Sequence, residues 1–152
     1  MKDPEVEPGS SLGVVRKAQI LTGALVVGMV MFAGVVAFLS EKGLVQSDDS
    51  GELGVLVWVA GGLLLALLPV AFLLRSAVFG RAAGGSKLVR ESGYQAGCLL
   101  FAATIEGGVL LNLVAVLLLG NWAVNGVAAA AGIMVMLAAF PTEAQYAELE
   151  RS

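Results

Sequence analysis

Four stretches of this chain are long, apolar and almost free of charged side chains, and this feature constrains the fold most strongly. They cover residues 18–39, 53–74, 95–119 and 122–140 of the 152 in the chain. A helix crosses the hydrocarbon layer of a bilayer, roughly 30 Å thick, with about 20 such residues. We therefore predict an all-α fold in the form of an integral membrane four-helix bundle.

The composition fits a bilayer better than water. The chain is 58% hydrophobic and 14% charged, whereas a soluble domain carries roughly 25% charged residues. The net charge of −3 provides no basic face for a nucleic acid, so no nucleic-acid partner is expected. The chain has no His and a single Cys, Cys98. We accordingly expect no disulfide within the chain, no metal site and no cofactor.

Short connections divide the chain into three parts. Residues 1–17 are predicted to be a cytoplasmic N-terminal segment, residues 18–140 the transmembrane domain, and residues 141–152 a cytoplasmic tail. The first span is expected to be retained rather than cleaved, because an acidic leader precedes it and its apolar stretch exceeds that of a signal peptide. In the tail, the sequence TEAQ has the form of a capping box and predicts a short helix from about Glu143 to Glu150. The alternative is a frayed, solvated tail.

The orientation follows from the Lys and Arg residues outside the spans. Three lie before the first span, four between the second and third spans and one in the tail, whereas the first connection holds only Lys42. With four spans, the first three of these regions share one side of the membrane. Cytoplasmic segments carry an excess of Lys and Arg. Both termini are therefore predicted to be cytoplasmic, in a bacterial cytoplasmic (inner) membrane.

The two longer connections leave alternatives open. The first, residues 40–52, is acidic and would bind a cation only if several oxygens were held in a fixed geometry; a solvated turn is the simpler expectation. The second, residues 75–94, either lies along the inner leaflet and attracts anionic lipid head groups or only fixes the topology. Gly84–Gly85 is expected to interrupt any helix in it.

Each span also contains small residues four positions apart. Helices in lipid associate through close backbone contact, which small residues allow. We predict that these residues mediate helix packing, either inside one chain or between copies. The pairs are Ala24 and Gly28, Gly62 and Ala66, Ala103 and Gly107, and Ala128 and Gly132.

Glu106 is the one charged residue within the four stretches. It lies roughly 16 Å from the inner end of its span, near the midplane of the bilayer, and acids at such positions are candidates for functional sites. One hypothesis makes Glu106 a reversible proton or cation carrier. The other makes it a hydrogen-bond donor to a carbonyl of a neighbouring helix, worth about 1 kcal/mol. The second is favoured, since the spans hold no further ionisable group to complete a relay.

Three segments of the chain point to known proteins: QILTGALVVGMVMF (19–32), IEGGVLLNLVAVLL (105–118) and FPT (140–142). In these segments the chain resembles a family of small, functionally uncharacterised inner-membrane proteins of bacteria with four spans. The third span alone also resembles the ion-carrying helix of rotary ATPase c subunits, in which a mid-membrane acid precedes a Leu- and Val-rich half. That second resemblance implies that Glu106 is an ion-binding carboxylate.

The leading hypothesis is a small, non-enzymatic integral membrane protein that associates with itself as a homo-oligomer or with a larger membrane complex. The alternative is a proton- or cation-handling membrane subunit that uses Glu106. A membrane enzyme has the least support, because the chain lacks His and a second carboxylate within the spans. Apart from the lipid bilayer, the sequence predicts no specific ligand.

Overall fold

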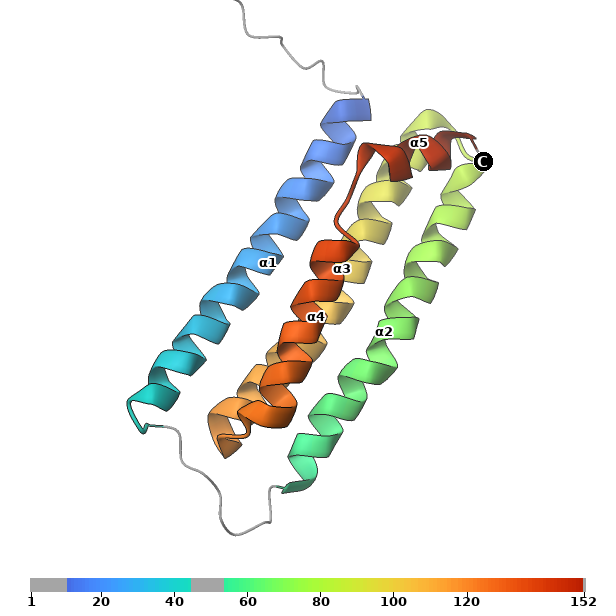
Figure 1. The fold of residues 1–152 in the computed structure, drawn as a ribbon. Coiled ribbons are helices and arrows are strands. Elements are labelled where there is room, and N and C mark those ends of the chain that lie inside the picture. Colours follow the sequence, from blue (N-terminus) through green and yellow to red (C-terminus); the bar gives the residue numbers. More distant parts are fainter. Residues whose placement is uncertain (1–10, 45–53, 152) are drawn as a thin grey trace, which may run out of the picture.

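The computed structural model describes residues 11–44 and 54–151, and all of the regular structure in them is helical (Figure 1). The predicted all-α fold is therefore confirmed. The acidic residues of the first connection that follow Leu44, and most of the N-terminal segment, lie outside the described residues. The elements are α1 (Ser11–Glu41), α2 (Gly54–Ala83), α3 (Lys87–Leu119), the π-helical turn η1 (Trp122–Gly126), α4 (Val127–Ala138) and α5 (Glu143–Arg151).

Three helices in the described part of the chain are long and apolar enough to cross a membrane. They are Leu12–Glu41, α2 and α3, with 30, 30 and 33 residues. The predicted fourth span is helical as η1 and α4, but Trp122–Ala138 becomes a fourth candidate only together with α5, toward which the chain bends by 60°. The number and length of these helices are those of a multi-pass membrane protein.

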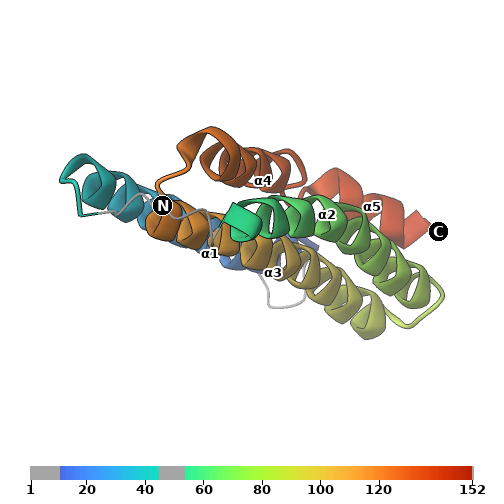
Figure 2. The same ribbon diagram turned by 90° about the horizontal axis from the view of Figure 1, so that it is seen from below.

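Helix α3 is the centre of the bundle. It contacts α1, α2, η1, α4 and α5, whereas no contact between α1 and α2 is found in the described residues. The sequence colours in Figure 1 show α1 and α3 running in one direction and α2 and α4 in the other. Helix α4 lies in front of α3 between α1 and α2, and in the view from below it lies to one side of them (Figure 2). Successive helices are thus antiparallel, as short connections require.

Glycines allow α2 and α3 to approach closely. Gly93 faces Ala82, and a Cβ atom added at Gly93 would overlap the Cβ of Ala82. Farther along, a Cβ atom added at Gly108 would lie 2.6 Å from Cδ1 of Leu64. Small residues that bring two backbones together are typical of helix packing in membranes. The close packing of α2 against α3 therefore requires glycine at these two positions.

The second connection is far shorter than the predicted loop of residues 75–94. Residues 75–83 continue α2 and residues 87–94 begin α3, so that only Gly84–Ser86 form the turn. The predicted interruption at Gly84–Gly85 is confirmed, whereas a loop of residues 75–94 is not found, because all but three of these residues are helical. The physical reason is packing between the two helices, in which the ring of Phe79 stacks on that of Tyr94 with centroids 5.6 Å apart.

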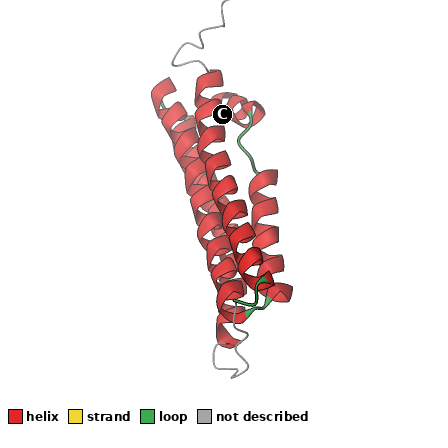
Figure 3. Cartoon of the chain, turned by 90° about the vertical axis from the view of Figure 1, so that its left-hand side faces the viewer, coloured by secondary structure: helices red, strands yellow, loops and turns green. Residues whose placement is uncertain are grey.

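The start of α1, the α2–α3 turn and α5 lie at the same end of the bundle, which we call the α5 end (Figure 1). The long helices follow one axis, and α5 lies across it (Figure 3). The predicted short C-terminal helix is confirmed as Glu143–Arg151. At the opposite end, α3 stops at Gly120, whose φ of 67° is the left-handed conformation that favours glycine.

The contact between Gly93 and Ala82 predicts a loss of stability in Gly93→Ala. The Cβ of Ala82 is fixed to its backbone, so an added methyl group forces α2 and α3 apart, and such overpacking costs typically about 1–3 kcal/mol. We expect the melting temperature of the detergent-solubilised protein to fall by at least about 3 °C. Gly34→Ala is the matched control, because nothing lies within 4 Å of a Cβ there. An equal loss in both variants would contradict the close helix contact.

Candidate functional site

Residues 139–142, here called the connector, join α4 to α5 at the α5 end of the bundle. The last carbonyl groups of a helix have no partner within that helix. Pro141, which is buried, adds no N–H group of its own. Carbonyl groups in a protein interior need hydrogen-bond donors, and side chains of three different helices donate to part-buried carbonyls of the connector.

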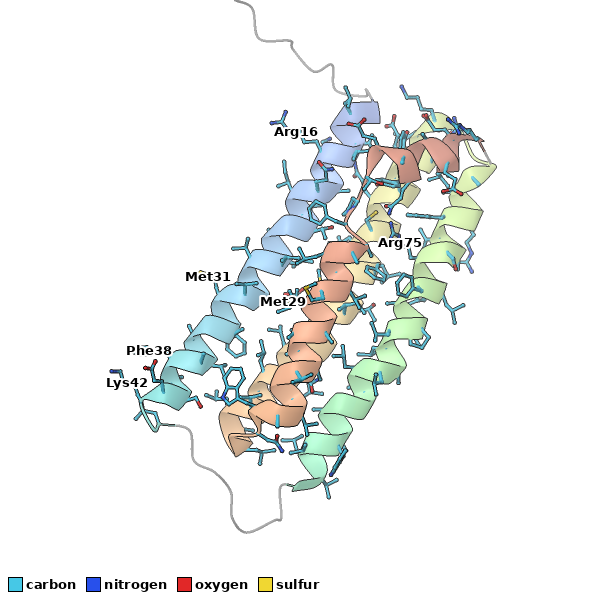
Figure 4. The ribbon with its side chains drawn as sticks, viewed as in Figure 1. Arg16, Met29, Met31, Phe38, Lys42 and Arg75 are labelled. Carbon is cyan, nitrogen blue, oxygen red and sulfur yellow. The ribbon has the colours of Figure 1, made fainter. Side chains whose placement is uncertain are left out.

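Arg75 of α2 supplies the first donor. Its side chain is 9% exposed and lies near the α5 end between α2 and the last segments of the chain (Figure 4). Nη1 donates to the carbonyl of Ala139 at 3.3 Å, and Nη2 donates to Oε1 of Gln145 at 2.6 Å. The guanidinium also lies over the rings of Phe79 and Phe101, at 5.2 Å and 5.4 Å from the centroids. One cation thus binds the end of α4 and the first turn of α5.

Helices α1 and α3 supply the other two donors. Nε2 of Gln19 donates to the carbonyl of Pro141 at 3.0 Å, and the hydroxyl of Tyr94 donates to the carbonyl of Thr142 at 2.9 Å. Gln19 and Pro141 are 122 positions apart in the chain. This contact therefore joins the start of the first predicted span to the residues that follow the fourth.

The charge of Arg75 is compensated without a carboxylate. In the described part of the chain the only ion pair is between Lys87 and Glu91, at 3.8 Å. Arg75 instead has a carbonyl at the end of α4, where the helix dipole is negative, the amide oxygen of Gln145 and two aromatic faces. An isolated buried charge is costly. These contacts hold the guanidinium in place and make it a link between helices.

Apolar contacts hold α5 against the bundle beside these hydrogen bonds. Tyr146 and Leu149 are buried in a cluster with residues of α1 and α3. The ring of Tyr146 packs edge-on against Tyr94 with centroids 5.2 Å apart. Burial raises the pKa of the Tyr146 phenol, and the carboxylates of Glu150 and Glu91 raise it further. The phenol therefore stays neutral where it packs.

The capping box at the start of α5 is only half formed. The hydroxyl of Thr142 accepts a hydrogen bond from the backbone N–H of Gln145 at 3.4 Å, as predicted. The side chain of Gln145 does not complete the box, because its oxygen accepts from Arg75 instead. The sequence motif thus predicts the start of the helix correctly and the use of its last residue wrongly.

A second polar group lies inside the bundle near its opposite end. Asn112 and Asn125 are both 0% exposed, and Nδ2 of Asn125 donates to Oδ1 of Asn112 at 2.9 Å. Asn112 also donates to the carbonyl of Ala60 at 2.9 Å, and Asn125 donates to that of Val57 at 3.1 Å. These bonds link α3 and η1 to the first turns of α2. Hydrogen bonds of this kind stabilise helix association in membranes by about 0.6–2 kcal/mol each.

Glu106 lies apart from both polar groups. Its side chain is half-buried on the flank of α3, next to Gly107, where a Cβ atom would meet nothing within 4 Å. Across residues 11–44 and 54–151, no hydrogen bond or ion pair involves Glu106. The predicted hydrogen bond to a neighbouring helix is therefore not formed within one chain. Neither hypothesis for this residue is decided by its position.

The predicted small-residue pairs divide into two groups. Gly132 of α4 is buried, and a Cβ atom there would overlap Val109 of α3. Ala128 is half-buried on the same helix. The other six residues are exposed, and of these Gly62 lines an apolar groove between α2 and α4; they are Ala24, Gly28, Gly62, Ala66, Ala103 and Gly107. For these, packing between copies stays a prediction.

The residues that organise the bundle interior were mostly missed by sequence reasoning. Arg75 directly follows the predicted second span, and Gln19 is the second residue of the predicted first one, so neither position indicates an interior contact. Asn125 gave a usable signal, since it is the one strongly polar side chain between Trp122 and Phe140. In the described residues, no group of three or more His, Cys, Asp and Glu side chains is placed to hold a metal ion.

Comparison with known proteins adds no relative. No protein-family model matches the chain, and no curated protein or solved structure is significantly similar to it. The fold therefore defines the class of this protein: an all-helical bundle whose longest helices have the length and apolarity of membrane spans.

The contacts of Arg75 predict that Arg75→Ala releases α5. Hydrogen bonds to charged groups contribute about 1.5–3 kcal/mol each, and this variant removes two of them from the end of α4 and the first turn of α5. We expect amide hydrogen exchange in residues 143–151 to accelerate at least tenfold, which corresponds to about 1.4 kcal/mol. Arg16→Ala is the control, because Arg16 is exposed on α1 (Figure 4). Unchanged exchange in Arg75→Ala would show that apolar contacts alone hold α5.

Proposed function

We propose that this chain is a small non-enzymatic integral protein of a bacterial cytoplasmic membrane, which acts through lateral association with further copies or with a larger membrane complex. The observation that carries the proposal is the exposed set of glycines on the flanks of the bundle. Gly28, Gly62 and Gly107 lie on three different helices, and a Cβ atom at any of them would meet nothing within 4 Å.

Glycine is a poor choice for a helix surface that faces only lipid. It lowers helix stability by about 0.8–1 kcal/mol relative to Ala and offers no side chain for packing. The bundle uses other glycines, such as Gly93, Gly108 and Gly132, for its internal contacts. The exposed ones fit a second role, which is close approach by a helix of another molecule.

The distribution of basic residues supports a cytoplasmic location for the α5 end. Arg16 and Lys42 lie at opposite ends of α1 (Figure 4), and Lys42 is the one basic residue at its end among those described. Arg81 and Lys87 are exposed beside the α2–α3 turn, at the α5 end. By the positive-inside rule, this distribution supports a cytoplasmic position of α5 and of both termini.

The second candidate function, proton or cation handling by Glu106, has one observation in its favour. The carboxylate is half-buried on the flank of α3 rather than locked in an internal hydrogen bond, so that it is reachable from a neighbouring subunit. Against it, the described spans place no second acid beside Glu106.

Association predicts that bulky residues at the exposed glycines weaken self-assembly. We expect Gly62→Ile and Gly107→Ile each to raise the dissociation constant in bilayers at least tenfold, about 1.4 kcal/mol, measured by fluorescence energy transfer between labelled copies. Glu106→Leu should act in the same direction, because it removes a hydrogen-bonding group beside Gly107.

The control for this experiment is Val59→Ile, which adds one methylene to an exposed side chain of α2 without closing a glycine gap. Circular dichroism checks that each variant remains helical. If all three test variants associate as the unaltered protein does, self-association through these faces is wrong. Co-purification of one other membrane protein with this chain at fixed stoichiometry would then support association with a larger membrane complex.

A hydrophobic carbodiimide separates the association and ion-handling functions. Such a reagent modifies protonated carboxyl groups that lipid can reach. Ion handling predicts selective labelling of Glu106 that falls as pH rises, together with loss of ion flux in Glu106→Gln. If the protein acts through association, Glu106→Gln should leave both ion flux and self-assembly unchanged, because the amide still donates a hydrogen bond. Flux lost in Glu106→Gln with assembly intact would contradict the leading proposal.

A further inference from the structure

A groove runs between α2 and α3 on the outer surface of the α5 end. It has a volume of about 370 Å³, and its walls are almost entirely apolar. The residues that line it are Val78, Arg81, Ala82, Val89, Ser92, Gly93 and Ala96. Two of them are polar, and the hydroxyl of Ser92 already donates to the carbonyl of Val89 at 3.1 Å. The groove therefore offers one free charged group above an apolar surface.

That charged group is Arg81. It is exposed in the last turns of α2. In the described part of the chain no hydrogen bond, ion pair or ring contact involves it. Arg75, two turns earlier on the same helix, is buried and has its partners inside the bundle. The two arginines thus differ in role: one links helices, and the other is available to a ligand.

The position of Arg81 along α2 matches the level of lipid phosphates. Trp58 is 73% exposed near the opposite end of α2, where aromatic side chains mark a membrane interface. Arg81 lies 23 residues later, which is about 35 Å of helix. The hydrocarbon layer is roughly 30 Å thick, and the head groups bring the total to about 40–45 Å. Arg81 then lies just beyond the hydrocarbon, with the apolar part of the groove reaching back into it.

We propose that this groove binds an anionic phospholipid of the inner leaflet, with Arg81 contacting the phosphate and the apolar walls contacting an acyl chain. The argument for this occupant is complementarity: a guanidinium presents donors in a fork that fits phosphate oxygens, and the remaining lining suits hydrocarbon. The exposed Leu88, at 74%, and Val89, at 45%, extend the apolar surface beside Arg81.

Lipid retention in native mass spectrometry tests the proposal. Protein in detergent micelles is mixed with equal amounts of phosphatidylglycerol and phosphatidylcholine that carry the same acyl chains. We expect the anionic lipid to be retained about fivefold more, because both lipids carry a phosphate but only phosphatidylglycerol has a net negative charge that one basic residue can attract. Arg81→Gln should reduce this preference to near unity. Ala96→Trp, which fills the apolar part of the groove, should reduce retention of both lipids.

The matched control is Arg16→Gln, which removes an exposed cation from the same end of the bundle on a different helix. If Arg16→Gln lowers the preference as much as Arg81→Gln does, diffuse surface charge explains the binding and the site is wrong. Retention that is unchanged in Ala96→Trp also overturns the proposal, because the groove is then not occupied. Thermal melting of each variant checks that the bundle is intact.

The inference rests on the proposed membrane placement, and the two can fail separately. Retention in micelles does not depend on which side of the membrane holds the α5 end. Reagent accessibility of Lys42→Cys and Arg81→Cys, each in a Cys98→Ala background, measures that sidedness in intact cells. If the anionic lipid is retained selectively but the accessibility of the two cysteines is reversed, the groove still binds lipid, in the other leaflet.

Discussion

Three part-buried carbonyl groups within residues 139–142 accept hydrogen bonds from side chains, and each of the three long helices supplies one donor. Gln19, Arg75 and Tyr94 lie on α1, α2 and α3, and all three donate to this one segment. A hydrogen bond of this kind contributes about 0.5–1.5 kcal/mol, and more where the donor is charged, so the three long helices and the connector are held in register by one set of contacts. The bend of 60° before α5 is stable for this reason, and it lays α5 across the end of the bundle.

Helix α3 integrates the remainder of the fold, because α1 and α2 pack on it without contacting each other in the described residues. Polar links at both ends of α3 strengthen this arrangement: Tyr94 reaches the connector, and Asn112 reaches the carbonyl of Ala60 and the side chain of Asn125. The middle of the bundle, around Ile105 and Val109, is apolar. The helices are thus fixed by polar contacts at their ends, and large parts of their flanks remain open to the surroundings.

The sequence predicted the helices well and their faces poorly. Long apolar runs and the TEAQ motif identified the spans and α5, because helix length and capping are local properties. Local sequence does not show which of Gly107 and Gly108 packs against α2. Adjacent residues differ by about 100° around a helix, and of these two only Gly108 faces Leu64. In a soluble helix the polar face reveals which side is buried, but a lipid-facing helix is apolar on every side. Contacts such as Gln19 with Pro141 join distant segments and leave no pattern in a single sequence.

Two neighbouring residues on the flank of α3, Glu106 and Gly107, each lack a contact that they need, and both face outward from the bundle. The carboxylate has no partner in the described residues, and Gly107 beside it has no backbone packed against it. In the proposed membrane placement, a carboxylate at this depth is costly unless a polar group or water meets it, whereas an exposed glycine gives up helix stability without a packing gain. A single helix from another molecule would satisfy both, since close approach at Gly107 brings backbone carbonyls within reach of Glu106, whose protonated form donates a hydrogen bond to them. One contact with another molecule would thus offset both energetic costs. The two residues together therefore argue more strongly for association than either does alone.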